Sequence, residues 1–159
     1  MRLQLESKDI VAIDPAAARF AYAVFDQGLL THCAYGKRTK EVLVRLTPSV
    51  QYLWVFETPQ DYDRFAVAHD DLDRLRAVLD RLARTARGRG DPVLRLTPHA
   101  WKGGVPKRVH HRRIWRVLSD MERRHMPDNP NDKDYAHDIH DAVALGLTCL
   151  QRGGTHGIP

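Results

Sequence analysis

The sequence is poor in cysteine and has no long apolar run. Its two cysteines, Cys33 and Cys149, are too few for a disulfide framework and lack the paired spacing of a zinc site. We therefore expect two buried free thiols in a reducing compartment. No run of about 18 apolar residues is present, which argues against a membrane-spanning helix. The N-terminus lacks the apolar segment of a secretory signal, so the expected location is the cytoplasm.

Acidic residues are scarce in the middle of the chain. Positions 81–124 contain 13 of the 25 lysine and arginine residues but only three acids, Asp91, Asp120 and Glu122. The whole chain has a formal net charge of +5. A concentrated basic segment favours a polyanionic partner, although a solvated helical face also explains part of the pattern.

The chain has neither internal repeats nor a low-complexity linker. Its 159 residues fit one domain, which we place at 1–152 with a short tail at 153–159. Hydrophobic patterning predicts strands at 9–14, 19–26, 29–36, 50–57 and 92–96, and helices at 39–46, 68–87, 107–125 and 133–150. The segment 97–106 reads as a loop. Three antiparallel strands followed by alternating helix and strand indicate an α/β domain with a five-stranded mixed sheet.

Two of the expected helices carry apolar faces. In the 107–125 helix, the residues expected on the buried side are Ile114, Val117, Leu118 and Met121. The leucine-rich face of the 68–87 helix, over residues 72–82, fits either packing on the sheet or contact with a second copy of the chain.

Four carboxylates stand out by position. Asp14 ends a strand that should be buried, and Glu57 ends another. Charged groups rarely occupy such places without a partner, because desolvating a charge is costly. Asp138 and Asp141 are three residues apart in the last helix, so they share one face. Taken singly, each has an ordinary explanation: a turn before Pro15, a strand-end salt bridge, or solvent-facing helix positions.

A single arrangement explains all four carboxylates. Mg²⁺ prefers carboxylate oxygens, and two such ions about 4 Å apart can activate a water and stabilise the leaving oxygen in phosphodiester hydrolysis. Such a site needs carboxylates from separate elements and cations nearby to hold phosphate. We therefore expect a nuclease centre.

Six short motifs resemble the RuvC-type Holliday junction resolvases of the RNase H-like, or retroviral-integrase, superfamily. In chain order they are residues 13–15 (Ile-Asp-Pro), 21–24 (Ala-Tyr-Ala-Val), 55–57 (Val-Phe-Glu), 101–103 (Trp-Lys-Gly), 106–108 (Pro-Lys-Arg) and 138–145 (Asp-Ile-His-Asp-Ala-Val-Ala-Leu). The likeness covers nearly the whole chain, and its patchiness favours a phage or otherwise divergent member.

The resemblance implies an RNase H-like fold and a specific chemistry. Asp14, Glu57, Asp138 and Asp141 would bind two Mg²⁺ ions, with Mn²⁺ as a substitute, and a homodimer would nick two strands of a four-way DNA junction. The products would carry 5′-phosphate and 3′-hydroxyl ends. Lys102 and Lys107 would contact the scissile phosphate or its neighbours, and the 68–87 helix would form the dimer interface. The protein would act in the cytoplasm of a bacterial cell or of a phage-infected host cell.

Further residues are candidates for roles around this site. His137 lies four residues before Asp141 and is a metal ligand, a proton shuttle, a neighbour of the site or a surface histidine. Asp134 lies one turn before Asp138 and is a candidate for a contact just beyond the direct metal ligands. A zinc pair of His137 with His140 is disfavoured, because no cysteine is near. The residues considered for DNA contact are Tyr62, Arg64, Phe65, Trp101, Lys102, Lys107, Arg108, Arg112 and Arg116. Phe65 and Trp101 also fit packing roles.

Two rival functions remain at this point. One is an RNA-directed nuclease of the same superfamily, of the RNase H or rRNA-processing type. The other is a non-catalytic nucleic-acid-binding module on the same fold. The complete carboxylate set argues against the second, because concentrated negative charge weakens DNA binding unless metal ions neutralise it.

Overall fold

The computed structural model describes residues 7–58 and 69–152, and the expected tail at 153–159 lies outside them. The strands in this part of the chain are β1 (Ile10–Pro15), β2 (Phe20–Asp26), β3 (Leu29–Gly36), β4 (Leu53–Glu57) and β5 (Val93–Leu96). The helices are α1 (Thr39–Leu43), α2 (His69–Gly88), α3 (Pro98–Lys102), α4 (Lys107–Val117), α5 (Asp120–Arg123) and α6 (His137–Cys149).

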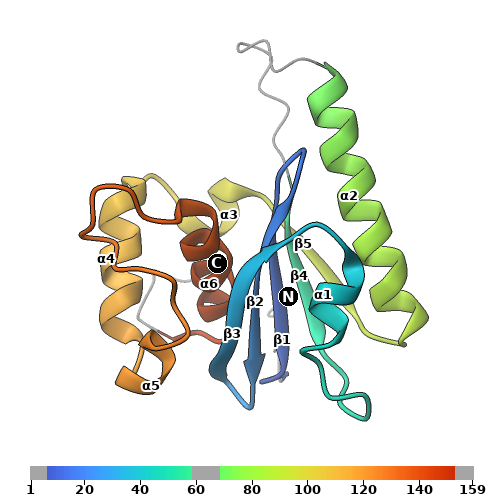
Figure 1. The fold of residues 1–159 in the computed structure, drawn as a ribbon, viewed down its shortest axis with the longest axis horizontal. Helices are drawn as coiled ribbons and strands as arrows, with labels where there is room; N and C mark the ends of the chain where they lie inside the picture. Colours follow the sequence, from blue (N-terminus) through green and yellow to red (C-terminus); the bar gives the residue numbers. More distant parts are fainter. Residues whose placement is uncertain (1–6, 59–68, 153–159) are drawn as a thin grey trace.

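The five strands form one mixed sheet in the order β3-β2-β1-β4-β5 (Figure 1). β1 pairs antiparallel with β2, and β2 pairs antiparallel with β3. The β2–β3 hairpin turns at Gln27 and Gly28, both with positive φ, as a two-residue type I′ turn requires. β4 lies parallel to β1 and to β5. The predicted fold class, an RNase H-like α/β domain with three antiparallel strands and then parallel ones, is confirmed.

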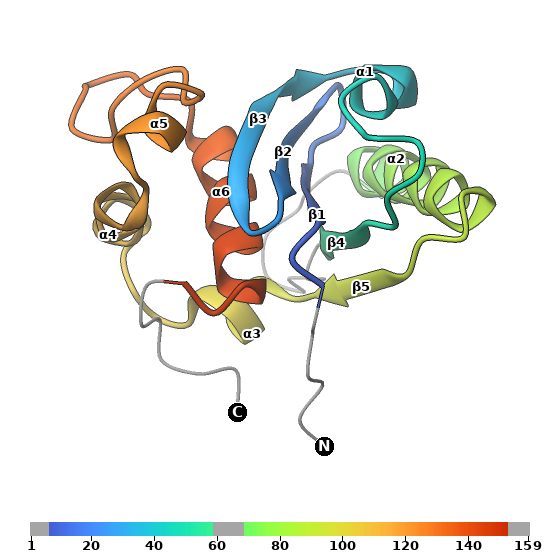
Figure 2. The same ribbon diagram turned by 90° about the horizontal axis from the view of Figure 1, so that it is seen from below.

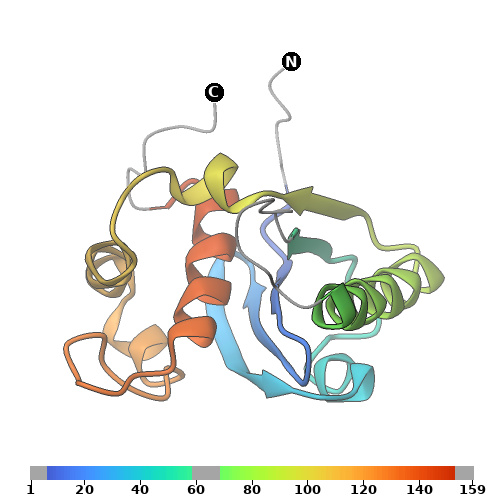
Figure 3. The same cartoon turned by 90° about the horizontal axis from the view of Figure 1, so that it is seen from above.

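Helices cover both faces of the sheet. In β1, Ile10 and Ala12 point into the core beneath α6, whereas Val11 and Ile13 point into the core beneath α1 and α2. This alternation is the period of an extended strand, and it explains why the central strand is apolar throughout. Figures 2 and 3 show α6 directly against the sheet, α4 outside α6, and α2 on the opposite side.

The leucine-rich face of α2 packs mainly on the sheet. Leu79 and Leu82 are buried in the core beneath α2, whereas Leu72 and Leu75 are only partly buried. Of the two predicted uses of this face, packing on the sheet is therefore the observed one for the C-terminal half of α2. The N-terminal end of the helix projects beyond the sheet (Figure 1).

The expected single helix at 107–125 is two helices. Leu118 has an extended backbone, and Ser119 opens α5 with a capping box to Glu122. The break changes the phase of the following residues, so the prediction that Met121 is buried is wrong: its side chain is 73% exposed. The segment 97–106, expected to be a loop, contains a short helix, α3. The Thr97 side chain caps this helix, and Pro98 occupies its first position, where proline is favoured. The last helix begins at His137, four residues later than predicted.

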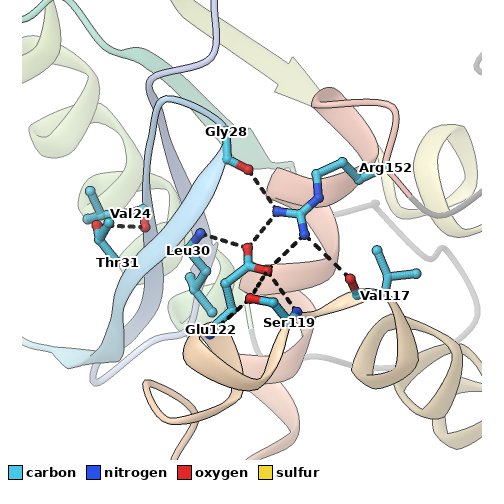
Figure 4. A network of polar contacts seen from close by, with 8 residues as sticks. All are labelled: Val24, Gly28, Leu30, Thr31, Val117, Ser119, Glu122 and Arg152. Atoms are coloured by element: carbon cyan, nitrogen blue, oxygen red, sulfur yellow. Dashed lines mark hydrogen bonds and ion pairs between the residues drawn. The ribbon is translucent and has the colours of Figure 1, made fainter.

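A largely buried ion pair between Glu122 and Arg152 links the β2–β3 hairpin to α5 (Figure 4). Glu122 accepts hydrogen bonds from the backbone of Leu30 and of Ser119, and Arg152 binds both of its oxygens at 2.5 and 2.8 Å. Arg152 also donates to the Gly28 carbonyl. Burial opposes ionisation, but these bonds outweigh it and lower the pKa of Glu122 to about 2. The contacts join the β2–β3 hairpin, α5 and the end of α6.

Both cysteines are buried free thiols, as predicted. Burial raises the pKa of Cys33 and of Cys149 to about 12, so neither is a reactive nucleophile. Among the described residues, no helix combines the length and the apolar character needed to cross a membrane.

Candidate metal centre

Two parallel strands deliver the first two carboxylates to one edge of the sheet. β1 and β4 pair as far as Ile13 with Phe56, and the next residues along are Asp14 and Glu57. Both side chains belong to the set that alternates toward α6, since Ile10, Ala12, Leu53 and Val55 all lie in the core on that side. The register therefore directs both carboxylates to the same helix.

Helix α6 supplies the other two carboxylates. Asp138 and Asp141 are one turn apart at its N-terminal end, and one ligand oxygen each from Asp14, Asp138 and Asp141 lies within 4.8 Å of the others. Asp141 is 2% exposed, although it is charged. Three of the four expected carboxylates thus form a compact cluster.

Helix α3 joins Glu57 to this cluster. The Trp101 indole N–H donates to Glu57 Oε2 at 2.9 Å. The Lys102 ammonium lies between two carboxylates, 3.7 Å from Glu57 Oε2 and 3.8 Å from Asp141 Oδ1. Glu57 therefore faces the same site, across one lysine, and all four carboxylates share one environment.

Asp141 has two close donors from α4. Lys107 Nζ lies 2.6 Å from Oδ2, and His111 Nε2 lies 2.7 Å from Oδ1. His111 is fully buried, and its Nδ1 lies 2.7 Å from the Tyr135 hydroxyl. Burial opposes ionisation of Asp141, but the hydrogen bonds from His111 and Lys107 lower its pKa to about 2. One carboxylate of the cluster is thus held ionised by the chain itself.

Asp14 has the opposite electrostatic environment. Burial, followed by repulsion from Glu57, Asp141 and Asp138, raises its pKa to about 8, and Lys107 only partly opposes this. The pKa of Glu57 is also raised, by burial and by Asp141, against the effect of Lys102. Four carboxylates thus share two ammonium groups, and the cluster carries more negative charge than its own cations neutralise.

This donor set fits hard divalent cations. Mg²⁺ and Mn²⁺ prefer carboxylate oxygens, and Asp14, Asp138 and Asp141 present three such oxygens close together. A divalent cation bound there would also give Asp14 a positively charged partner. Asp14, Asp138 and Asp141 would hold such an ion, and Glu57 lies beside them across Lys102.

The other predicted residues lie at different places. Trp101 is 5% exposed and serves as a core anchor, so of its two predicted roles the packing one is observed. His137 is exposed and contacts the Tyr135 ring, with ring centroids 4.0 Å apart. Asp134 is exposed and has no ion pair or hydrogen bond to the described residues. Tyr62, Arg64 and Phe65 lie outside the described residues.

The arginines of α4 divide into two groups. Arg108 donates to the carbonyls of Asp132 and Lys133, so it holds the loop before α6. Arg112 and Arg116 are exposed, and their guanidinium groups have no acidic partner in the described part of the chain. They remain available to an external anion.

Sequence reasoning missed His111 and Tyr135. A signal existed for His111, because it lies four residues after Lys107 and therefore on the same face of α4. Tyr135 belongs to an irregular segment with no periodicity, so only the folded arrangement shows that it reaches His111.

Known structures provide an independent comparison. The chain is similar to a RuvC structure from Thermus thermophilus, with a TM-score of 0.63, 18% sequence identity, and coverage of 87% of this chain and 91% of that one. It has a RuvC-like fold. The structure of T. thermophilus RuvC in complex with Holliday junction substrate aligns with a TM-score of 0.58 and 17% identity, over 87% of this chain and 90% of that one. No family model and no curated protein sequence matches the chain.

Proposed function

We propose that the chain is a divalent-metal-dependent endonuclease that resolves four-way DNA junctions. The observation that carries the proposal is the convergence of Asp14, Asp138 and Asp141 within 4.8 Å at the strand edge that also carries Glu57. The RuvC-like fold supports the choice of substrate, because one structure of that fold holds a Holliday junction.

The carboxylates would bind two Mg²⁺ ions, and Mn²⁺ would replace them. Bound there, the ions would supply an activated water and stabilise the departing 3′-oxygen, which leaves 5′-phosphate ends. Lys102 and Lys107 would hold the scissile phosphate, since their ammonium groups already lie at the cluster and Lys107 is 44% exposed. Trp101 would keep Glu57 facing the site through its 2.9 Å hydrogen bond.

The basic face of α4 would grip the DNA backbone. Arg112 and Arg116 are exposed on the helix that also carries Lys107. Phosphate contacts position DNA without reading its sequence, which suits recognition of a junction by its shape. Arg108 would contribute less, because the loop carbonyls already engage it.

We also propose that the active form is a homodimer, since a junction presents two strands for cleavage. The C-terminal half of α2 is used in the core, and Leu75 also packs against it, so the interface would lie on the N-terminal turns of α2, near the partly buried Leu72. Light scattering should give a mass of twice 18.2 kDa. A mass of 18.2 kDa at the concentration used for cleavage would contradict this part of the proposal.

A cleavage panel tests the function. The substrates are a mobile four-way DNA junction, linear duplex DNA, an RNA–DNA hybrid and structured RNA, each with Mg²⁺, Mn²⁺ or EDTA. We expect cuts in the junction with either metal, ligatable 5′-phosphate ends, and no cuts in EDTA. Preferential cutting of the hybrid or of RNA would favour the RNA-directed nuclease. Junction binding without cleavage would favour the non-catalytic module.

A further inference from the structure

One contact of the acidic cluster comes from a side chain that is fully buried. His111 is 0% exposed, and both of its ring nitrogens are engaged, Nε2 with Asp141 Oδ1 and Nδ1 with the Tyr135 hydroxyl, each at 2.7 Å. Tyr135 is itself 4% exposed. A chain of three buried groups thus ends on a carboxylate of the cluster.

Hydrogen-bonding capacity fixes the direction of this chain. The other oxygen of Asp141 accepts from Lys107, so the side chain is a carboxylate and offers no proton. His111 must therefore donate from Nε2 to Oδ1, and the Tyr135 hydroxyl can donate to the remaining lone pair on Nδ1. In this one tautomer of His111, each of the hydrogen bonds that link Tyr135, His111 and Asp141 has a donor and an acceptor.

Packing fixes the plane of the ring. The Tyr135 ring meets the His111 ring edge-on at 89°, with centroids 5.5 Å apart, and the His140 ring lies 5.4 Å away. The imidazole is therefore enclosed between aromatic neighbours. Lys107 differs, because its side chain is 44% exposed and could leave Asp141 for solvent without crossing packed side chains.

We propose that His111 is a positioning residue which, oriented by Tyr135, holds Asp141 Oδ1 and so presents Asp141 Oδ2 to a divalent cation. The inference deepens the proposed function, because it assumes that the cluster binds metal. Lys107 occupies Oδ2 in the metal-free protein and is the contact that gives way. Partners of this kind set the orientation of a ligand, and losing one typically weakens metal affinity by about 10- to 100-fold.

The test measures Mn²⁺ binding to the free protein by electron paramagnetic resonance, with no DNA present. His111→Leu removes the donor and keeps an apolar side chain of similar volume. We expect it to weaken Mn²⁺ binding by about 10- to 100-fold. His111→Gln can still offer an N–H near the Nε2 position and should recover most of the affinity. Tyr135→Phe should have a smaller effect, because it leaves the His111–Asp141 contact in place.

His140 provides the matched control. It is fully buried, and its ring packs against the His111 ring. It hydrogen-bonds to Asp128, however, and not to the acidic cluster. His140→Leu keeps an apolar neighbour against the His111 ring and leaves the His111–Asp141 contact in place. It should therefore lower the melting temperature and change the Mn²⁺ affinity far less than His111→Leu does. Wild-type Mn²⁺ affinity in His111→Leu would overturn the proposal. Equal weakening in His111→Leu and His140→Leu would also overturn it, since the effect would then be loss of packing.

A junction-cleavage series separates this inference from the proposed function. In His111→Leu we expect the Mn²⁺ concentration for half-maximal cleavage to rise by about 10- to 100-fold, while the rate at saturating Mn²⁺ stays close to that of the wild type. If the wild type cuts no junction but binds Mn²⁺, the nuclease proposal fails and the role of His111 is still decided by binding. If the wild type cuts and His111→Leu binds Mn²⁺ normally, only the inference fails.

Discussion

Two buried carboxylate sites in this protein have opposite electrostatics. Glu122 is surrounded by donors and a guanidinium, and its pKa falls to about 2. Asp14 is surrounded by other carboxylates, and its pKa rises to about 8. The first site is complete within the chain and stabilises the fold. The second lacks a balancing positive charge at the edge of the sheet where β1 and β4 end. Such an excess of carboxylates is what a cation site requires.

The two sites also differ in what they connect. The Glu122–Arg152 pair joins segments far apart in the sequence (Figure 4), and the Glu122 side chain is only 3% exposed. The acidic cluster joins β1, β4 and α6 through side chains that repel one another. Stability and the proposed function thus depend on separate ion clusters, so substitutions at each should have separable effects.

The largest effect is expected at Asp14. Asp14→Asn should reduce Mg²⁺-dependent junction cleavage by about 1,000-fold, equivalent to about 4 kcal/mol of transition-state stabilisation. The same change removes a repelled charge, so the metal-free variant should melt at a higher temperature, by about 2–4 °C for each kcal/mol relieved. Single-turnover cleavage and thermal melting in EDTA measure the two quantities.

Asp120→Asn is the matched control for this change, because Asp120 is a surface acid with a 90% exposed side chain. It should alter neither cleavage nor melting. Full-rate cleavage by Asp14→Asn would remove the basis of the proposed function.

The next effect is expected at Glu122. Glu122→Gln leaves Arg152 partly buried without its counter-charge and should lower the free energy of unfolding by about 3–5 kcal/mol. Mn²⁺ affinity at the acidic cluster should not change. Urea denaturation and Mn²⁺ titration of the same sample check both statements. A loss of metal affinity equal to that of Asp14→Asn would show that the two sites are not separable.

The pH dependence of stability should carry the two signatures in opposite directions. The lowered pKa of Glu122 means that its contribution is complete above about pH 4.5 and is lost as the pH falls through about 2. The raised pKa of Asp14 means that the metal-free fold loses stability as the pH rises from 3.8 through about 8.

Melting temperatures across pH in metal-free buffer test this difference. Glu122→Gln should flatten the acid limb and Asp14→Asn the limb toward pH 8. Parallel curves for all three proteins would contradict the assignment of either pKa shift.

The smallest effect is expected on the basic face of α4. Arg112→Gln and Arg116→Gln should each weaken junction binding modestly and reduce the slope of log affinity against log salt concentration by about 1. Arg84→Gln, on the exposed side of α2 across the sheet, is the control and should leave the slope unchanged. An equal change in all three variants would indicate a non-specific charge effect.

The sequence predicted which strands and which helix carry the four carboxylates, because strand ends and helical spacing can be recognised locally. Buried parallel strands end at one edge, so Asp14 and Glu57 could be paired in advance, and helical spacing placed Asp138 with Asp141. The prediction of three antiparallel strands and then parallel ones followed from the alternation of turns and helices. These are short-range properties of the chain.

Other features depend on short capping signals within a longer apolar pattern or on tertiary contacts. Ser119 and Glu122 form a capping-box pattern that marks a new helix, and this pattern explains the break before Met121. The buried role of Trp101 and the contact of His111 with Asp141 depend on how α3 and α4 pack against α6. No local pattern specifies contacts between residues 30 or more positions apart.

The most direct test is a crystal structure of the protein grown with Mn²⁺ and measured at a wavelength that gives anomalous scattering from manganese. We predict an anomalous peak bonded to carboxylate oxygens of Asp14 and Asp141, with Lys107 displaced from Asp141 Oδ2 and His111 still on Oδ1. A map with no peak among Asp14, Glu57, Asp138 and Asp141, at a Mn²⁺ concentration that supports junction cleavage, would contradict the proposed metal centre.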